Sequence, residues 1–154
     1  MALRIYASDH DGRYPFHTNG FGNALLQLIK EGALDNNEGS VRYITGPGDN
    51  GQVFKDALKI DAPIPEERCS RVYVQGLSET NNHDIAVIFD KNSMPGGDHF
   101  RKPWGPLLRE VCMVDGSMQV IREENWGSFA SNQVELLVRQ GLDRRTAEHY
   151  YKIP

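Results

Sequence analysis

Residues 110–121 carry the clearest structural signal in the chain and read Glu110-Val111-Cys112-Met113-Val114-Asp115-Gly116-Ser117-Met118-Gln119-Val120-Ile121. Two runs of alternating apolar side chains flank the dipeptide Asp115-Gly116. This arrangement predicts a β-hairpin that is closed by a two-residue type I′ turn. The predicted cross-strand pairs are Val114 with Ser117, Met113 with Met118, and Val111 with Val120. One face of the hairpin is then wholly apolar, and we expect it to lie on the core. This face consists of Val111, Met113, Met118 and Val120.

Two segments before the hairpin also have strand character. Residues 71–75 alternate between polar and apolar side chains until Gly76 interrupts the pattern. Residues 85–89 form a continuous apolar run, which is typical of a strand that is buried on both faces. Residues 91–106 are rich in proline and glycine and are predicted to form a long loop. Three or four antiparallel strands are therefore expected.

The chain opens with a short helical pattern, in which Leu3, Tyr6 and Ala7 follow the i, i+3, i+4 spacing. Gly12 is expected to end this helix, because glycine accepts a left-handed backbone without steric cost. So few helical turns are marginal on their own, since helix nucleation is costly. We therefore expect residues 1–12 to be the end of a first helix whose beginning is absent from this sequence.

A second helix is indicated by one apolar stripe at i, i+4, i+7 and i+8. The stripe consists of Phe21, Leu25, Leu28 and Ile29. Thr18 or Asn19 is expected to cap its start and Gly32 to end it.

The segment between this helix and the first strand is rich in polar residues. Residues 41–44 are predicted to form a strand and residues 53–58 a short helical turn. Residues 62–65 alternate with proline and are expected to be extended.

The last part of the chain, residues 123–154, is predicted to be a helical extension. Val134, Leu137 and Val138 form an apolar stripe, and Gly141 is expected to end that helix. Asp143 is expected to cap a last short helix that runs to Tyr151.

Helical and strand patterns are segregated along the chain, which favours an α+β fold with an antiparallel sheet over a parallel sheet. The length of 154 residues suits a single domain, residues 1–154. Leu, Ile, Val and Phe make up 37 residues, about 24% of the chain, which is above the level of disordered proteins.

Charge and hydropathy exclude some classes of partner. The 17 Lys and Arg residues are outnumbered by 21 Asp and Glu, and neither half of the chain is basic. Composition therefore gives no support for binding to nucleic acid or to an anionic membrane. The sequence has no apolar run long enough to span a bilayer and no secretory signal peptide.

The two cysteines, Cys69 and Cys112, are too few for a disulfide scaffold and do not form a CxxC motif. A structural role is favoured over a catalytic thiol. Because both lie at or near predicted strands, the sequence leaves open whether they are buried thiols or a disulfide pair.

The two tryptophans, Trp104 and Trp126, are predicted to be single aromatic side chains in loops. A position at the edge of a small core is favoured for both over a role in contacting a partner.

Histidine–aspartate neighbours raise the hypothesis of a metal-dependent hydrolase. They involve His10, His83 and His99, each beside at least one aspartate. Histidine and carboxylate are common zinc and iron ligands. However, no HExxH motif and no helical pair of histidines is present. Polar turns that need no metal explain these pairs better.

Asp9 and Asp11 begin like the first two ligands of a calcium loop. An EF-hand then requires glycine at position 6 and glutamate at position 12, where this chain has Tyr14 and Gly20. The EF-hand interpretation therefore fails. A different calcium site at Asp9 and Asp11 remains a hypothesis, and no other cofactor is expected.

The opening segment, residues 3–15, resembles the end of the long first helix in type IV pilin-like proteins, and more closely in type II secretion pseudopilins. It reads Leu3-Arg4-Ile5-Tyr6-Ala7-Ser8-Asp9-His10-Asp11-Gly12-Arg13-Tyr14-Pro15. Residues 73–77, 86–90 and 111–121 are similar to the sheet of that family, which ends in a hairpin with an Asp-Gly turn. Asp115 and Gly116 match that turn, and His99 lies where these proteins often carry a histidine. The resemblance covers about residues 3–122, and residues 123–154 extend beyond it.

The resemblance implies a non-enzymatic structural subunit with an N-terminal helix packed on the sheet. In this family, a prepilin peptidase cleaves a leader, and about 20 apolar residues then anchor the subunit in the inner membrane before it joins a filament. The implied partners are other pilin-like subunits and the assembly machinery, contacted through residues 35–52 and 91–106. The implied location is the periplasm or the cell surface. The isolated head is expected to be monomeric or weakly associating.

Two alternatives to this structural role remain open from the residues alone. The first is an exported binding module that is stabilised by calcium at Asp9 and Asp11. The second is the hydrolase that would use His10, His83 and His99.

Overall fold

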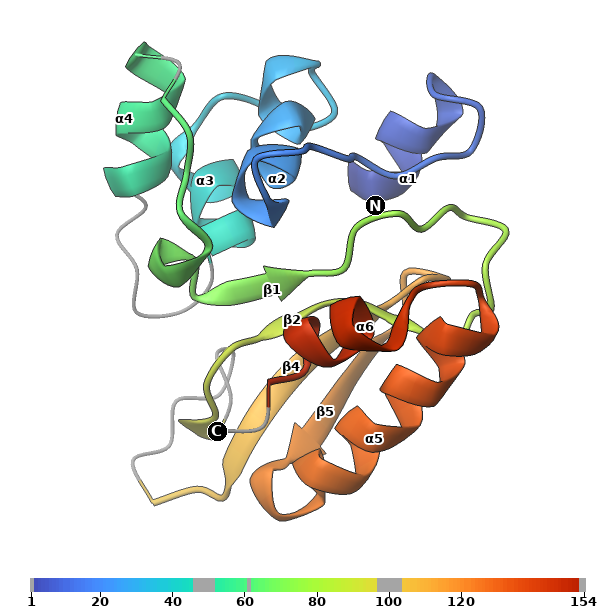
Figure 1. The fold of residues 1–154 in the computed structure, drawn as a ribbon. Helices are drawn as coiled ribbons and strands as arrows, with labels where there is room; N and C mark the ends of the chain where they lie inside the picture. The colour runs from blue at the N-terminus through green and yellow to red at the C-terminus, as the bar shows by residue number, and fades with distance from the viewer. Residues whose placement is uncertain (1, 46–51, 61, 97–103, 153–154) are drawn as a thin grey trace. The chain divides into compact units, whose positions relative to one another are not determined.

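The computed structural model describes residues 2–45, 52–60, 62–96 and 104–152 (Figure 1). The chain divides into two compact units, one ending at Glu79 and the next beginning at Thr80. Each unit is described by itself below. The expected single domain over residues 1–154 stays a prediction.

In its described part, the N-terminal unit consists of four α-helices, one 3-10 turn and one short strand (Figure 1). They are α1 (Ala2–Ser8), α2 (Phe21–Lys30), α3 (Glu38–Thr45), α4 (Gln52–Ile60), the 3-10 turn Glu66–Arg68 and β1 (Arg71–Tyr73).

Helix α1 buries the side chains that the helical spacing predicted, Leu3, Tyr6 and Ala7. The helix lies beside α2 in the same unit. After Ser8 the chain turns, and Gly12 has a φ of 76°, as expected for a glycine that ends a helix.

Helix α2 buries its whole predicted apolar stripe. The prediction that Thr18 or Asn19 caps this helix is wrong. The N-cap is Gly20, which has no side chain to accept a hydrogen bond from the first turn. Instead, Glu66 from the 3-10 turn accepts a hydrogen bond from the backbone N–H of Phe21 at 3.2 Å. A distant carboxylate therefore satisfies the helix start, and its negative charge also suits the helix dipole.

The strand predicted at residues 41–44 is wrong, because this segment belongs to helix α3. Val41 and Ile44 are both buried and lie three residues apart, which suits one face of a helix equally well. Asn37 caps the helix by accepting a hydrogen bond from the N–H of Ser40 at 2.9 Å. Four residues are too few for periodicity alone to separate strand from helix. The predicted helix at 53–58 is confirmed, and residues 62–65 lie outside regular elements, with Pro65 in an extended conformation.

In its described part, the C-terminal unit consists of four strands followed by two helices. They are β2 (Ala86–Asp90), β3 (Met94–Pro95), β4 (Leu107–Met113), β5 (Met118–Arg122), α5 (Glu123–Arg139) and α6 (Arg144–Tyr150). Strand β4 is central. Both β2 and β3 pair antiparallel with β4 on one side, and β5 pairs antiparallel with it on the other.

The predicted hairpin is present, but its turn and register differ from the prediction. Met113 donates to the carbonyl of Ser117 at 2.9 Å, and Gly116 donates to the carbonyl of Met113 at 2.9 Å. These bonds close a three-residue loop with a left-handed glycine, since Gly116 has a φ of 85°. A type I′ turn would also require a positive φ at Asp115, which the structure does not have.

This loop shifts the register by one residue, so Cys112 pairs with Met118 and Val111 pairs with Gln119. A one-residue shift moves every side chain of a strand to the opposite face. The expected core face is therefore wrong for Met118 and Val120, which are 55% and 57% exposed.

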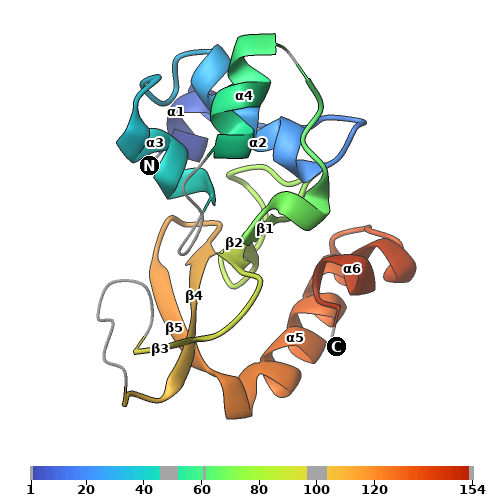
Figure 2. The same ribbon diagram turned by 90° about the vertical axis from the view of Figure 1, so that its left-hand side faces the viewer.

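Helices α5 and α6 lie on one side of the strands of this unit (Figure 2). The aromatic side chains of Trp126 and Tyr151 pack against Phe89 of β2, with ring centroids 5.4 Å and 4.6 Å away. The covered face of the sheet is therefore the one that carries Phe89 and, by register, Val111. Met118 and Val120 belong to the opposite face.

The predicted loop position is correct for Trp104 and wrong for Trp126, whereas the predicted position at the core is correct for Trp126 and wrong for Trp104. Trp126 lies in helix α5, not in a loop, and is 3% exposed. Trp104 lies outside the regular elements and is 97% exposed. The α+β class, the antiparallel sheet and the C-terminal helices are confirmed.

Candidate functional site

The turn after α1 is tied to a segment that is more than 60 residues away in the sequence. The N–H of Gly12 first closes the helix on the carbonyl of Ala7 at 2.9 Å. The carbonyl of Gly12 then accepts from the N–H of Glu79 at 2.9 Å, and Tyr14 donates to the carbonyl of Leu77 at 3.1 Å. Together these bonds fix the end of α1 to residues 77–79.

The segment that follows this turn is fixed in the same way. The hydroxyl of Tyr73 in β1 donates to the carbonyl of Pro15 at 2.8 Å, and both residues are buried. The side chain of Gln75 accepts from the N–H of His17 at 2.7 Å. We call the backbone of residues 12–17 together with residues 73–79 the α1 clasp.

His10 lies beside the clasp and contacts helices α1 and α2. Its Nδ1 lies 2.7 Å from the carbonyl oxygen of Tyr6, and its Nε2 lies 2.8 Å from Oε2 of Glu31. The imidazole also stacks on the ring of Tyr6, with centroids 3.8 Å apart. Burial, and secondarily the charge of Glu31, raise the pKa of the Tyr6 phenol. Through these contacts, His10 links the end of α1 to the end of α2.

The two calcium candidates, Asp9 and Asp11, both have exposed side chains. Asp11 has a φ of 52°, a left-handed conformation that aspartate tolerates better than most residues. His83 is exposed as well, and His99 lies outside the described residues. Within the described ranges, no group of three or more His, Cys, Asp or Glu side chains is arranged to hold a metal ion.

The two cysteines are buried but are not joined by a disulfide in this structure. The thiol of Cys69 lies 3.7 Å from the carbonyl oxygen of Pro65, and that of Cys112 lies 3.7 Å from the carbonyl oxygen of Met113. Of the two readings that the sequence left open, the structure has buried thiols.

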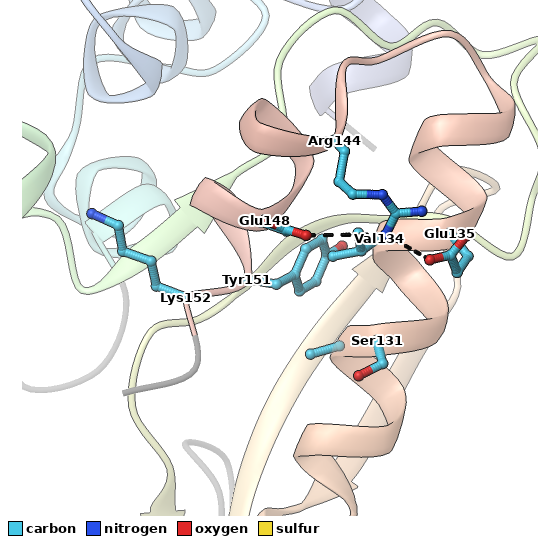
Figure 3. A pocket seen from close by; sticks show the side chains of 8 residues that line it. Ser131, Val134, Glu135, Arg144, Glu148, Tyr151 and Lys152 are labelled. Carbon is cyan, nitrogen blue, oxygen red and sulfur yellow. Dashed lines mark hydrogen bonds and ion pairs between the residues drawn. The ribbon is translucent and has the colours of Figure 1, made fainter.

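A groove of about 460 Å³ lies between α5 and α6 (Figure 3). Its lining residues are Ala130, Ser131, Val134, Glu135, Arg144, Glu148, Tyr151 and Lys152. Arg144 lies between two carboxylates, with its Nη1 at 2.7 Å from Glu135 and at 4.0 Å from Glu148. The hydrogen bond from Arg144 holds the pKa of the Glu135 carboxyl below its ordinary value.

Tyr151 forms the wall of this groove, but its hydroxyl points out of it. The hydroxyl donates to the carbonyl of Ala86 in β2 at 3.2 Å, and burial raises the pKa of the phenol. Asp143 caps α6, as predicted, by accepting from the N–H of Thr146 at 3.0 Å. The groove residues therefore hold α6 on α5 and β2. The cap at Asp143 was predictable from the sequence, whereas no pattern indicated the ion pairs of Arg144.

The buried Arg109 forms a hydrogen-bond network with a half-buried glutamate at the base of α5. Its Nε and Nη2 donate to the two carboxylate oxygens of Glu123, both at 2.8 Å, and its Nη1 donates to the carbonyl of Lys91 at 2.6 Å. The guanidinium lies 4.4 Å from the ring centroid of Trp126, which is a cation–π contact. The hydrogen bond from Arg109 lowers the pKa of Glu123. This network joins β4 to the first turn of α5.

Within the described residues, no helix is long and apolar enough to cross a lipid bilayer. Comparisons of the chain with protein-family models, with curated proteins and with solved structures found no match.

Proposed function

We propose that this chain is the globular head of a pilin-like subunit and that it acts as a non-enzymatic structural protein in a type II secretion or type IV pilus-like apparatus. The subunit would assemble into a filament through an apolar helix that precedes residue 1 in the complete protein. Its partners would be other pilin-like subunits and the assembly machinery. Its location would be the periplasm or the cell surface, after anchoring in the inner membrane.

The α1 clasp is the observation that carries this proposal. A head that is pulled or packed through an N-terminal helix needs that helix to be fixed in the fold at its C-terminal end. Helix α1 has only seven residues, and such a short helix is unstable without tertiary support. Here it is supported by a buried face and by the backbone bonds from Gly12 and Tyr14 to residues 77–79.

The clasp also supports the sequence resemblance. Residues 9–15, which carry part of that resemblance, form the turn that the clasp holds against residues 77–79. The turn at residues 9–12 is the part of the chain that bends away from α1 and meets the segment before β2. A second supporting feature is the hairpin at Asp115 and Gly116, which retains a glycine with positive φ at the turn.

The test is mass spectrometry of the N-terminal peptide of the native protein, purified from its source cells. The proposal predicts an N-methylated first residue followed by about 20 apolar residues, enough to span a bilayer. A polar, unmethylated N-terminus close to residue 1 would contradict the proposal.

A second experiment separates this proposal from the metal-dependent alternatives. Metal analysis of the purified protein is expected to find no stoichiometric calcium, zinc, iron or manganese. Calcium that is lost in an Asp9→Asn, Asp11→Asn variant would favour the binding module. A transition metal that is released by His99→Ala would favour the hydrolase.

A further inference from the structure

Strand β5 has an unprotected edge. Among the described residues it pairs only with β4, so its other side, which we call the open edge, has no neighbouring strand. Natural proteins usually protect such edges with lysine, proline, a bulge or a covering element. β5 reads Met118-Gln119-Val120-Ile121-Arg122, contains neither lysine nor proline, and has one charge at its last position. Met118 and Val120 are more than half exposed.

The hydrogen-bond phase of the hairpin shows which backbone groups face the open edge. The N–H of Met113 bonds to the carbonyl of Ser117, which makes these two residues a hydrogen-bonded pair. In an antiparallel ladder such pairs alternate with non-bonded pairs. Gln119 therefore bonds to β4, whereas Met118 and Val120 direct their N–H and C=O groups to the open edge.

A hydrogen bond on the other side of β4 supports this alternation of bonded and non-bonded pairs. Glu110 is the register partner of Val120, so its own N–H must point away from β5. That N–H donates to Oδ2 of Asp90, on the side of β2, at 2.9 Å.

We propose that the open edge of β5 pairs with the same edge of a second copy of this chain, in an antiparallel, two-fold symmetric dimer. We place the axis beside Val120, the central residue of those whose backbone groups face the open edge. Val120 then bonds to Val120 of the second copy, and Met118 lies opposite Arg122. The proposal concerns the head alone and does not depend on the pilin-like function.

Charge and shape suit this pairing. Arg122 is the only charged side chain in β5, and it lies two residues from the axis. The two copies of Arg122 are therefore about 13 Å apart along the strands, beyond the screening length of about 8 Å in physiological salt. Each Arg122 also has Glu124 of its own chain at 3.4 Å. The aliphatic stem of Arg122 can cover Met118 of the second copy.

The size of the edge predicts a weak dimer. Five residues bury less than the roughly 1,000 Å² that marks a stable interface, so association should appear only at high concentration. The contact is therefore reversible, and it becomes effective when two copies of this chain are held close together.

The test is sedimentation equilibrium of the chain from about 10 μM to about 1 mM, the range of weak association. The average mass is expected to rise toward twice the monomer mass. Val120→Lys places two like charges at the axis and should weaken dimerisation at least tenfold. Ile60→Lys, which changes an exposed isoleucine of the N-terminal unit, should leave dimerisation unchanged.

A backbone variant keeps the test independent of side-chain effects. Val120→Pro removes the N–H that the dimer needs, and proline is tolerated where this group faces away from the sheet. It should abolish dimerisation while the circular dichroism spectrum stays that of the parent; if it fails to fold, Val120→Lys decides. A parent chain that stays monomeric at 1 mM, or that dimerises equally well with Val120→Lys, would overturn the proposal.

Discussion

β2 and β5 flank the same central strand, β4, and they differ in almost every contact. All five side chains of β2 are buried, whereas four of the five in β5 are exposed. At the first residue of β2, Gln133 accepts from the N–H of Ala86 at 2.9 Å, and Tyr151 donates to its carbonyl at 3.2 Å. Among the described residues, β5 has no neighbouring strand on its open edge.

This difference follows from where the C-terminal helices lie. Helix α5 begins directly after β5 and α6 follows it, yet Trp126 of α5 and Tyr151 at the end of α6 reach Phe89 in β2. Helix α5 also contacts β5, yet four of the five side chains of that strand stay exposed. On one side of β4, the buried strand β2 contributes to stability. On the other side, the exposed strand β5 is available to a partner.

The largest expected effect comes from removing the aromatic support of β2. Trp126→Ala should lower the free energy of unfolding by about 3–5 kcal/mol, because it deletes a buried ring that contacts both Phe89 and Arg109. Trp104→Ala is the matched control, since that side chain is 97% exposed. Urea unfolding measures both, and equal losses would contradict the difference in packing.

A smaller effect is expected from the polar support of β2. Gln133→Leu removes the acceptor of the Ala86 N–H and the donor to the carbonyl of Asp84. Leaving such buried groups unpaired should cost about 1–3 kcal/mol. Gln119→Leu, at an exposed position of β5, should change stability by less than about 0.5 kcal/mol. A comparable loss at Gln119 would show that β5 is supported as strongly as β2.

The hairpin register can be tested with two glycines that differ in backbone conformation. Gly116→Ala should destabilise the protein by about 1–2 kcal/mol, because its φ of 85° is left-handed. Gly127→Ala should stabilise it by about 1 kcal/mol, because this helical position has space around it. Thermal unfolding measures both shifts. A stabilising Gly116→Ala would contradict the three-residue loop.

The smallest effect concerns pH. The hydrogen bond from Arg109 lowers the pKa of Glu123 below its ordinary value of 4.5. The contribution of this pair to stability is therefore complete above pH 4.5. It is lost as the pH falls through the lowered pKa that Glu123 has in the folded protein. Glu123→Gln should reduce the loss of stability on acidification, and Glu124→Gln, at an exposed pair, should not. Identical acid unfolding curves for the parent and Glu123→Gln would contradict this.

Sequence periodicity predicted the elements whose apolar pattern is long. The stripe of α2 and the buried run of β2 are both confirmed. Periodicity failed where the structure depends on one local conformation. Residues 41–44 fit a helix as well as a strand, and the hairpin register depends on the φ of Asp115, which Asp-Gly alone does not determine.

The candidate sites were harder to predict because they depend on distant contacts. The sequence located the turn at residues 9–12, but nothing in it indicated that Leu77 and Glu79 would bind that turn. The open edge of β5 was missed for a related reason. The wrong register placed Val120 in the core, and a shift of one residue placed it on the surface.

The most direct test of the contrast between β2 and β5 is amide hydrogen exchange, resolved by residue with NMR and followed over a range of protein concentrations. We predict that Ile88, the register partner of Cys112 in β4, is protected at every concentration. In β5, Gln119 should be protected, while Met118 and Val120 exchange rapidly in dilute protein and slow down as the concentration rises. Slow exchange of Val120 at all dilutions, equal to that of Ile88, would contradict the account.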